Sequence, residues 1–491
     1  MAETMVSEPV QTLPPPELVA VEEALPGDTA LVVAAQEGLT FFNACSTTSW
    51  NEVVETQREV RRPQRKQSEL NLELSAWRLS RDATETVREP WAEEVRTNIQ
   101  KCRAALGVLS SGSPASSKAR GLQELQDAAE VASAYMWKLV RSRGGAQVEW
   151  QHVEEREGFV LTQVATWVVH FACDRVLEAV HALDHAFIFG GPNPMLQPMV
   201  NATLERLAVL PSARNKARRS FPSKIPELAR VPDLGSLVPR CSWRPRMTPE
   251  DTPGLTGAHL GTLTDAELRK KLQQRKPLVI EGVTANWAAR EKWVHMGFWE
   301  SLHPRLVPVD VAVRQTQEDI GLAEQVMDIK AFVMKFMEIS AASPGIPARA
   351  AYLAKHPLFE QFPLLKEDFE KPRFVPECEG VHAWMGTTGT TTRTRFDVFD
   401  NLLVQVGGFK FVRMFPPSDG QFLYPVDGSD RCKDTVCDVD VENPDLQKHP
   451  KFANTSPVDV VLGPGDSVFV PCRWWCYTRN ITPSLSVSFK W

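Results

Sequence analysis

The sequence has no hydrophobic stretch long enough to cross a membrane, because its most apolar segment, residues 159–180, is interrupted by His170, Asp174 and Arg175. It also has no excess of one charge, since 55 basic and 61 acidic residues give a net charge of −6. That balance provides no overall positive field for nucleic acid. The first residues, MAETMVSEPVQTLPPPE, are acidic and proline-rich and lack the pattern of a secretory signal.

Cysteine and histidine are both sparse. Nine cysteines in 491 residues, an odd number without dense spacing, favour reduced thiols in an intracellular protein, nuclear or cytoplasmic. A single histidine, His449, follows His382. A metal site in the last quarter of the chain therefore has few imidazole nitrogens available.

The remaining composition is that of a globular protein with several domains. Residues 1–30 are expected to be a disordered lead-in. Apolar residues at three- and four-residue spacing predict a helical domain over 31–210, with a buried helix or helix pair at 158–189. Residues 211–260 are rich in proline and arginine and predict a linker. Its basic residues, with those at 61–66, fit either solvated charge or a nuclear import signal.

The last domain, residues 261–491, begins with mixed helices and strands and is nearly all strands after Pro376. This density of strands predicts a β-sandwich or jelly roll, so the whole chain is expected to be α+β. The stretch NLLVQVGGFKFVRMF, residues 401–415, predicts a hairpin with a two-residue turn at Gly407–Gly408 and with Gln405 opposite Lys410. In that register Asn401 and Lys410 share an apolar face. Burying an unpaired ammonium is unfavourable, so Lys410 either reaches the rim, pairs with an internal acid or holds an anionic ligand inside a barrel.

Several motifs in this domain resemble those of the JmjC-domain 2-oxoglutarate oxygenases. The resemblance is to the bifunctional peptidase and arginyl-hydroxylase group in particular, formerly described as lysine demethylases. It covers residues 263–491 and is weaker in the helical domain. The segments that carry it are KPLVIEGVTANWAAREKW, YLAKHPLFEQFPLLKEDFEKP, AWMGTTGTTT, NLLVQVGGFKFVRMFPP, LYPVD, DVDVENPDLQKHPKF, LGPGDSVFVPCRWWCY and LSVSFKW.

The resemblance implies a JmjC (cupin-like) double-stranded β-helix that holds Fe(II) on two histidines and one carboxylate, next to 2-oxoglutarate. For the cosubstrate it implies binding by Lys410, Asn401 and Tyr352, with the Thr392 hydroxyl nearby. For the substrate pocket it implies Trp384, and Asp310 as an acid that grips a substrate arginine.

The iron ligands do not match this pattern. The expected His-x-Asp is Arg395-Phe396-Asp397, and the expected distal histidine is Cys476, so only Asp397 matches. A guanidinium has no lone pair to offer a metal. Cys476 could bind as a thiolate, but sulfur suits zinc or copper(I) better than iron(II). We interpret the site as one in which Arg395 replaces the metal and pairs with Asp397.

Two other metal arrangements remain open from the sequence. His382 lies two residues before Trp384 and shares its face if the strand is regular. Cysteines 432, 437, 472 and 476 could hold zinc, although neither spacing is the usual two-residue gap.

The sequence thus favours a catalytically impaired pseudo-oxygenase that binds a protein or peptide, such as a histone or another basic protein. The alternative is an active 2-oxoglutarate-dependent oxygenase that hydroxylates or demethylates an arginine or lysine in a protein. Retention of Lys410, Asn401 and Tyr352 favours the alternative, whereas Arg395 and Cys476 count against it. Peptidase activity has no Ser-His-Asp or Cys-His pair to support it.

Overall fold

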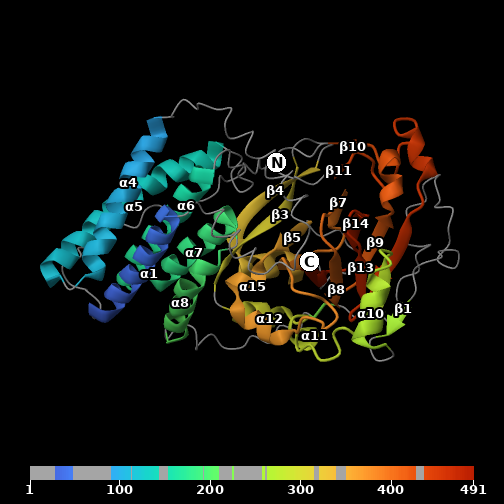
Figure 1. Cartoon of the computed structure of the whole chain (residues 1–491), viewed down its shortest axis with the longest axis horizontal. Coiled ribbons are helices and arrows are strands. Elements are labelled where there is room, and N and C mark those ends of the chain that lie inside the picture. Colours follow the sequence, from blue (N-terminus) through green and yellow to red (C-terminus); the bar gives the residue numbers. More distant parts are fainter. Residues whose placement is uncertain are drawn as a thin grey trace, which may run out of the picture. The chain divides into compact units, whose positions relative to one another are not determined.

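The chain forms two compact units, Met1–Arg214 and Asn215–Trp491 (Figure 1). The computed structural model describes residues 28–47, 90–111, 113–142, 153–191, 193–209, 224–225, 257–259, 263–302, 304–314, 320–338, 350–426 and 436–491. The predicted lead-in and the basic segments at 61–66 and 216–219 lie outside these ranges, as does most of the predicted linker. The domain boundaries at 30, 210 and 260 therefore stay predictions.

The N-terminal unit is helical in all its longer described segments. Its helices are α1 (Asp28–Thr47), α4 (Pro90–Ser110), α5 (Ala115–Ser142), α6 (Val153–Ala172), α7 (Val176–Gly190) and α8 (Gln197–Val209). The apolar stretch 158–189 is a helix pair, because the chain reverses between α6 and α7 at Asp174, whose φ is 58°. Trp167 is fully buried in the core and donates from Nε1 to Thr203 Oγ1 at 2.9 Å.

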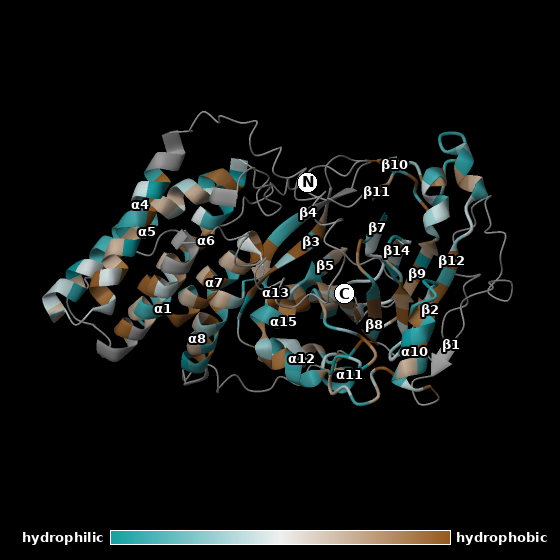
Figure 2. Ribbon diagram, viewed as in Figure 1, coloured by the Kyte–Doolittle hydropathy of each residue, from teal (hydrophilic) through white to brown (hydrophobic). Residues whose placement is uncertain are grey.

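The two long helices α4 and α5 each have an apolar and a polar side (Figure 2). The buried side of α5 includes Leu122, Leu125, Ala129, Ala132 and Met136, which recur at three- to four-residue spacing. The residues buried along α5 therefore follow the predicted helical periodicity. Among the described residues, no helix is long and apolar enough to cross a membrane.

The C-terminal unit contains two sheets among the described residues. In spatial order the nine-stranded sheet consists of β1 (Gly257–His259), β2 (Leu278–Glu281), β13 (Ser467–Val470), β8 (Asn401–Gly407), β15 (Ser484–Lys490), β6 (Gly380–Gly386), β5 (Ala351–His356), β3 (Leu306–Arg314) and β4 (Ile320–Asp328). The six-stranded sheet consists of β10 (Pro425–Val426), β11 (Val436–Cys437), β7 (Thr391–Phe396), β14 (Trp475–Asn480), β9 (Lys410–Phe415) and β12 (Val458–Leu462).

From β6 to β9, and again from β12 to β15, consecutive strands alternate between the two sheets. β6, β8, β13 and β15 belong to the nine-stranded sheet, whereas β7, β9, β12 and β14 belong to the six-stranded one. The pairs are antiparallel, except for the short pair of β1 with β2. This alternation is that of a jelly roll, and the predicted α+β class with a C-terminal double-stranded β-helix is confirmed.

The predicted hairpin at Gly407–Gly408 is wrong. β8 pairs with β13 and β15, whereas β9 pairs with β12 and β14, so the chain crosses from one sheet to the other at this point. Gly408 has a φ of 73°, and a Cβ there would lie 2.0 Å from the Pro483 carbonyl oxygen. Gly407 and Gly408 therefore allow the chain to pass closely from one sheet to the other, and they do not form a hairpin turn.

The space between the sheets is filled by inward-facing side chains from both. Leu403 and Val468 come from the nine-stranded sheet, and Val412 and Leu462 from the six-stranded one. The opposite face of the nine-stranded sheet packs on short helices, among them α10 (Asp265–Leu272) and α12 (Met296–Ser301). Asn401 and Lys410 therefore share the interior because their strands face each other across it.

Two helical segments in this unit are interrupted. The segment 359–369 is divided into α15 (Leu358–Gln361) and a 3-10 turn, Pro363–Asp368, because Pro363 cannot continue the helix. The segment 328–339 begins as α13 (Ile329–Phe332) and continues as a π-helical turn, Val333–Met337.

Candidate functional site

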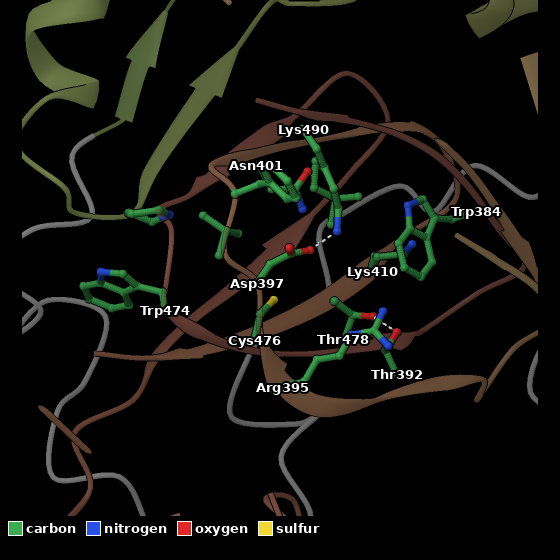
Figure 3. Close-up of a pocket in the computed structure, with 14 residues that line it drawn as sticks. Trp384, Thr392, Arg395, Asp397, Asn401, Lys410, Trp474, Cys476, Thr478 and Lys490 are labelled. Carbon is green, nitrogen blue, oxygen red and sulfur yellow. Dashed lines mark hydrogen bonds and ion pairs between the residues drawn. The ribbon is translucent and has the colours of Figure 1, made fainter. Parts of the chain in front are cut away.

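A cavity opens between the two sheets of the C-terminal unit (Figure 3). Its lining combines charged, polar and aromatic side chains from both sheets and the loops at their ends. These residues are Trp384, Thr392, Arg395, Asp397, Phe399, Asn401, Leu403, Lys410, Val470, Pro471, Trp474, Cys476, Thr478 and Lys490.

Strand ends and strand register bring these side chains together. Lys490, on β15, pairs in register with Asn401 at the start of β8. Cys476, on β14, lies opposite Arg395 on β7. Asp397 directly follows the last residue of β7. The three positions predicted for an iron triad therefore meet at one place, although they are not three metal ligands.

Asp397 forms an ion pair with Lys490, which the sequence did not indicate (Figure 3). The Lys490 side chain is 7% exposed and that of Asp397 is 25% exposed, so the pair is largely shielded from solvent. Burial lowers the pKa of Lys490, as do the positive charges of Lys355 and Arg395, whereas the Asp397 carboxylate favours its charged form. The cation paired with Asp397 is thus Lys490, whereas the prediction was Arg395.

A signal for Lys490 was present in the alternation of β15. Ser484, Ser486 and Ser488 precede it at two-residue spacing, and all are buried. Trp384, a predicted pocket residue, donates from Nε1 to Ser488 Oγ at 2.9 Å. Extending that face by two residues would have placed Lys490 inside the same pocket.

The Arg395 side chain extends toward Thr392 and Thr478, whose hydroxyls lie 2.7 Å apart (Figure 3). Tyr352 is 3% exposed, and its burial raises its pKa to about 12, although the Thr392 and Thr478 hydroxyls and the Arg395 charge act to lower it. Thr392 lines the cavity and Tyr352 does not. Arg395 therefore belongs to a cluster with the predicted Tyr352 and Thr392.

Lys410 is buried at the centre of the unit, with 1% of its surface exposed. Its Nζ lies 5.9 Å from the centre of the Trp384 ring. Among the residues that the structure describes, no carboxylate forms an ion pair with it. Burial lowers the pKa of Lys410 to about 7. Lys410 therefore lies in the interior, where it was expected. None of the described side chains is the anion that was expected to pair with it.

Asn401, the other predicted cosubstrate residue on this face, lines the cavity beside Lys490. Its Oδ1 is buried and has no hydrogen-bond partner among the described residues. The amide can be turned either way without changing the fold. It is therefore available to a ligand as a donor or as an acceptor.

Asp310, the predicted substrate acid, lies on β3 and does not line the cavity. In register it is opposite Tyr352 on β5 and Glu324 on β4. Burial raises the pKa of Glu324 to about 8, and the nearby Asp310 charge adds to that rise. The two carboxyl groups together form an acidic pair next to Tyr352.

The residues at the expected iron position do not fit that metal. Asp397 already bears an ammonium, Arg395 has no lone pair, and burial raises the pKa of the Cys476 thiol to about 12. His382 does not line the cavity. Within the described ranges, no three His, Cys, Asp or Glu side chains are arranged to hold a metal ion. For the proposed cysteine site, Cys432 lies outside those ranges.

This double-stranded β-helix with a polar cavity between its sheets defines a cupin-like protein, and residues 264–491 match the cupin-like domain family. The chain is 31% identical over 324 residues to zebrafish (Danio rerio) lysine-specific demethylase 8, covering 64% of this chain and 75% of that protein. The chain belongs to the JmjC-domain family that includes lysine-specific demethylase 8.

Two further relatives extend the similarity into the helical unit. JmjC domain-containing protein F of Dictyostelium discoideum is 26% identical over 412 residues, which are 72% of this chain and 85% of that protein. Lysine-specific demethylase JMJ30 of Arabidopsis thaliana is 29% identical over 385 residues, which are 74% and 86% of the two chains. The family implies Fe(II) and 2-oxoglutarate, of which only the second has suitable residues here.

Proposed function

We propose that this protein is a pseudo-oxygenase of the JmjC family, which binds a protein partner and does not oxidise it. The ion pair between Lys490 and Asp397 carries this proposal, because it occupies the carboxylate of the one residue that matches an iron ligand. Oxygen activation in this family depends on Fe(II) with open coordination positions. No step of that chemistry can be assigned to the residues present.

The cosubstrate residues support binding without turnover. Lys410, Asn401 and Thr392 line one cavity, and together they offer an ammonium, an amide and a hydroxyl. These groups would hold the carboxylate and polar atoms of 2-oxoglutarate. Their presence is also what favours the second candidate, an active oxygenase with an altered metal shell.

A protein partner is supported by two features of the surface near the cavity. Val398 is 64% exposed and Phe399, which lines the cavity, is 36% exposed. Exposed apolar residues of this kind often mark interaction sites. Glu324 lies directly opposite Asp310, and burial together with the Asp310 charge raises its pKa to about 8, so a cationic side chain beside the pair would favour its charged form. We infer a partner with a basic side chain, such as a histone tail.

Metal content and turnover together test the proposal. The full chain, purified and incubated with excess Fe(II), should retain far less than one iron per chain after desalting. It should not convert 2-oxoglutarate to succinate with arginine- or lysine-containing peptides. Iron near one per chain, or succinate formed above a heat-inactivated control, would establish the active oxygenase instead.

Partner binding needs a separate experiment. Arg- and Lys-containing histone peptides should bind the wild type, and Asp310→Asn should weaken that binding by about tenfold or less, as expected for one charge contact. The exposed change Glu377→Gln serves as a control on the same unit. Equal binding by Asp310→Asn and Glu377→Gln would exclude Asp310 from the partner site.

A further inference from the structure

The charges inside the cavity are predominantly positive. Three cationic side chains line it, namely Arg395, Lys410 and Lys490, and Asp397 is the one carboxylate among the lining residues. The cations come from β7, β9 and β15, so both sheets contribute to the excess. Such an interior favours an anion over a neutral or basic ligand.

Lys410 has no counter-ion among the described side chains. It is 1% exposed, its Nζ lies over the Trp384 ring, and the Cys476 thiol is nearby. Burial disfavours the charged form of Lys410, and an aromatic face stabilises a cation only partly. A ligand carboxylate on Nζ would favour the ammonium form, and the Asn401 amide lines the same cavity.

Lys490 also lines the cavity, and in its charged form it has three N–H donors. Asp397 accepts from it, and the remaining donors can serve a second carboxylate. The difference from a metal is chemical. A metal with open positions can bind a 2-oxo acid through carboxylate and ketone together, whereas an ammonium attracts the carboxylate and does not depend on a neighbouring ketone.

We propose that Lys410 and Lys490 each hold one carboxylate in a metal-independent site for short dicarboxylates, which does not require a 2-oxo group. The inference rests on the proposed function, because a bound iron would displace Lys490 from Asp397. It adds Lys490 as a ligand-binding residue, and it predicts a selectivity different from that of a metal-dependent site. The ligand class is a free aliphatic dicarboxylate.

Calorimetric titration of the full chain in EDTA tests the selectivity on the wild type. Glutarate should bind within about threefold of 2-oxoglutarate, and butyrate, with one carboxylate, at least about tenfold more weakly. Malonate, succinate, glutarate and adipate should show an optimum at one length, set by the spacing of the two ammonium groups. Binding of 2-oxoglutarate without glutarate would overturn the inference, and so would equal affinity along the length series.

Variants test the roles of Lys410 and Lys490 separately. Lys410→Met and Lys490→Met should each weaken glutarate binding at least about tenfold, whereas the exposed control Lys451→Met should leave it unchanged. If Lys490→Met binds glutarate as tightly as the wild type does, Lys490 is not part of the site. Iron content measured on the same samples separates the two proposals. No iron and no dicarboxylate would reject only this inference, whereas stoichiometric iron would reject the proposed function.

Discussion

Lys490 and Asp397 should stabilise each other measurably, because both are largely removed from solvent. In a double-mutant cycle with Lys490→Met and Asp397→Ala, we expect a coupling energy of about 1–3 kcal/mol from chemical denaturation. Either single change leaves one charge in the cavity without its partner, so the double variant should lose less than the sum. The cycle of Asp397→Ala with exposed Lys451→Met should be additive. Additivity in the Lys490 cycle would mean that the pair is not formed in solution.

Lys490 should also decide whether an iron site can be rebuilt. Restoring both histidines with Arg395→His and Cys476→His supplies the missing nitrogens, but it leaves an ammonium on Asp397. We therefore expect tight Fe(II) binding only when Lys490→Met is added, with an affinity at least about tenfold higher than that of the double variant. Titration of Fe(II) without oxygen measures this, and Lys451→Met in the double-variant background is the matched control. Equal affinities with and without Lys490→Met would show that Lys490 is no barrier.

The residue scale also shows what the sequence could and could not provide. Asn401, Lys410, Thr392 and Trp384 were named from motif positions, and these positions line one cavity. Their roles remain predictions. Lys490 lies in the LSVSFKW segment but was overlooked because the resemblance implied no role for that position, although the alternation along β15 placed it on the buried face. Partners in space, such as Asp397 for Lys490, depend on the register between strands that are distant in sequence.

At the scale of elements, the α6–α7 pair should make the helical unit sensitive to acid. Burial, followed by the positive charges of Arg175 and His181, lowers the pKa of His170 from 6.5 to about 4. The unfolded chain therefore takes up a proton at this residue before the folded chain does. Above pH 6.5 the neutral His170 contributes fully to the free energy of unfolding. This contribution, about 1–3 kcal/mol, should be lost as the pH falls through about 4.

Circular dichroism of helix unfolding between pH 4 and 7.5 measures this effect. His170→Gln removes the titrating group and should flatten the dependence, while His185→Gln is a useful comparison because burial also lowers the pKa of His185 to about 4. A pH dependence that is unchanged in His170→Gln would exclude this residue as its source.

Elements also differ in how well local sequence predicts them. Helices α5 and α6–α7 followed from apolar spacing, because their burial pattern is set within each segment. The hairpin at Gly407–Gly408 was wrong for the opposite reason. A glycine pair is typical of a tight turn, but β8 and β9 find their partners in β15 and β14, which lie far along the chain.

At the scale of the whole molecule, the two units have separate hydrophobic cores, so we expect two thermal transitions. Glutarate should raise only the transition of the C-terminal unit, since a ligand stabilises the unit that binds it, by about 2.7 kcal/mol at 100 times Kd. Calorimetry of the full chain with and without glutarate measures both. Butyrate is the matched control, and a shift of both transitions by glutarate would contradict the assignment of the site to one unit.

The place of β15 has a consequence for the order of folding. It follows every other strand in the sequence, yet it lies between β6 and β8 within the nine-stranded sheet. Those two strands cannot complete their ladders until β15 has been inserted between them. Pairings between distant segments form slowly, because long loops must close before contacts compensate for the lost entropy. Lys490 is carried by this strand, so Asp397 gains its ion-pair partner only once β15 has paired.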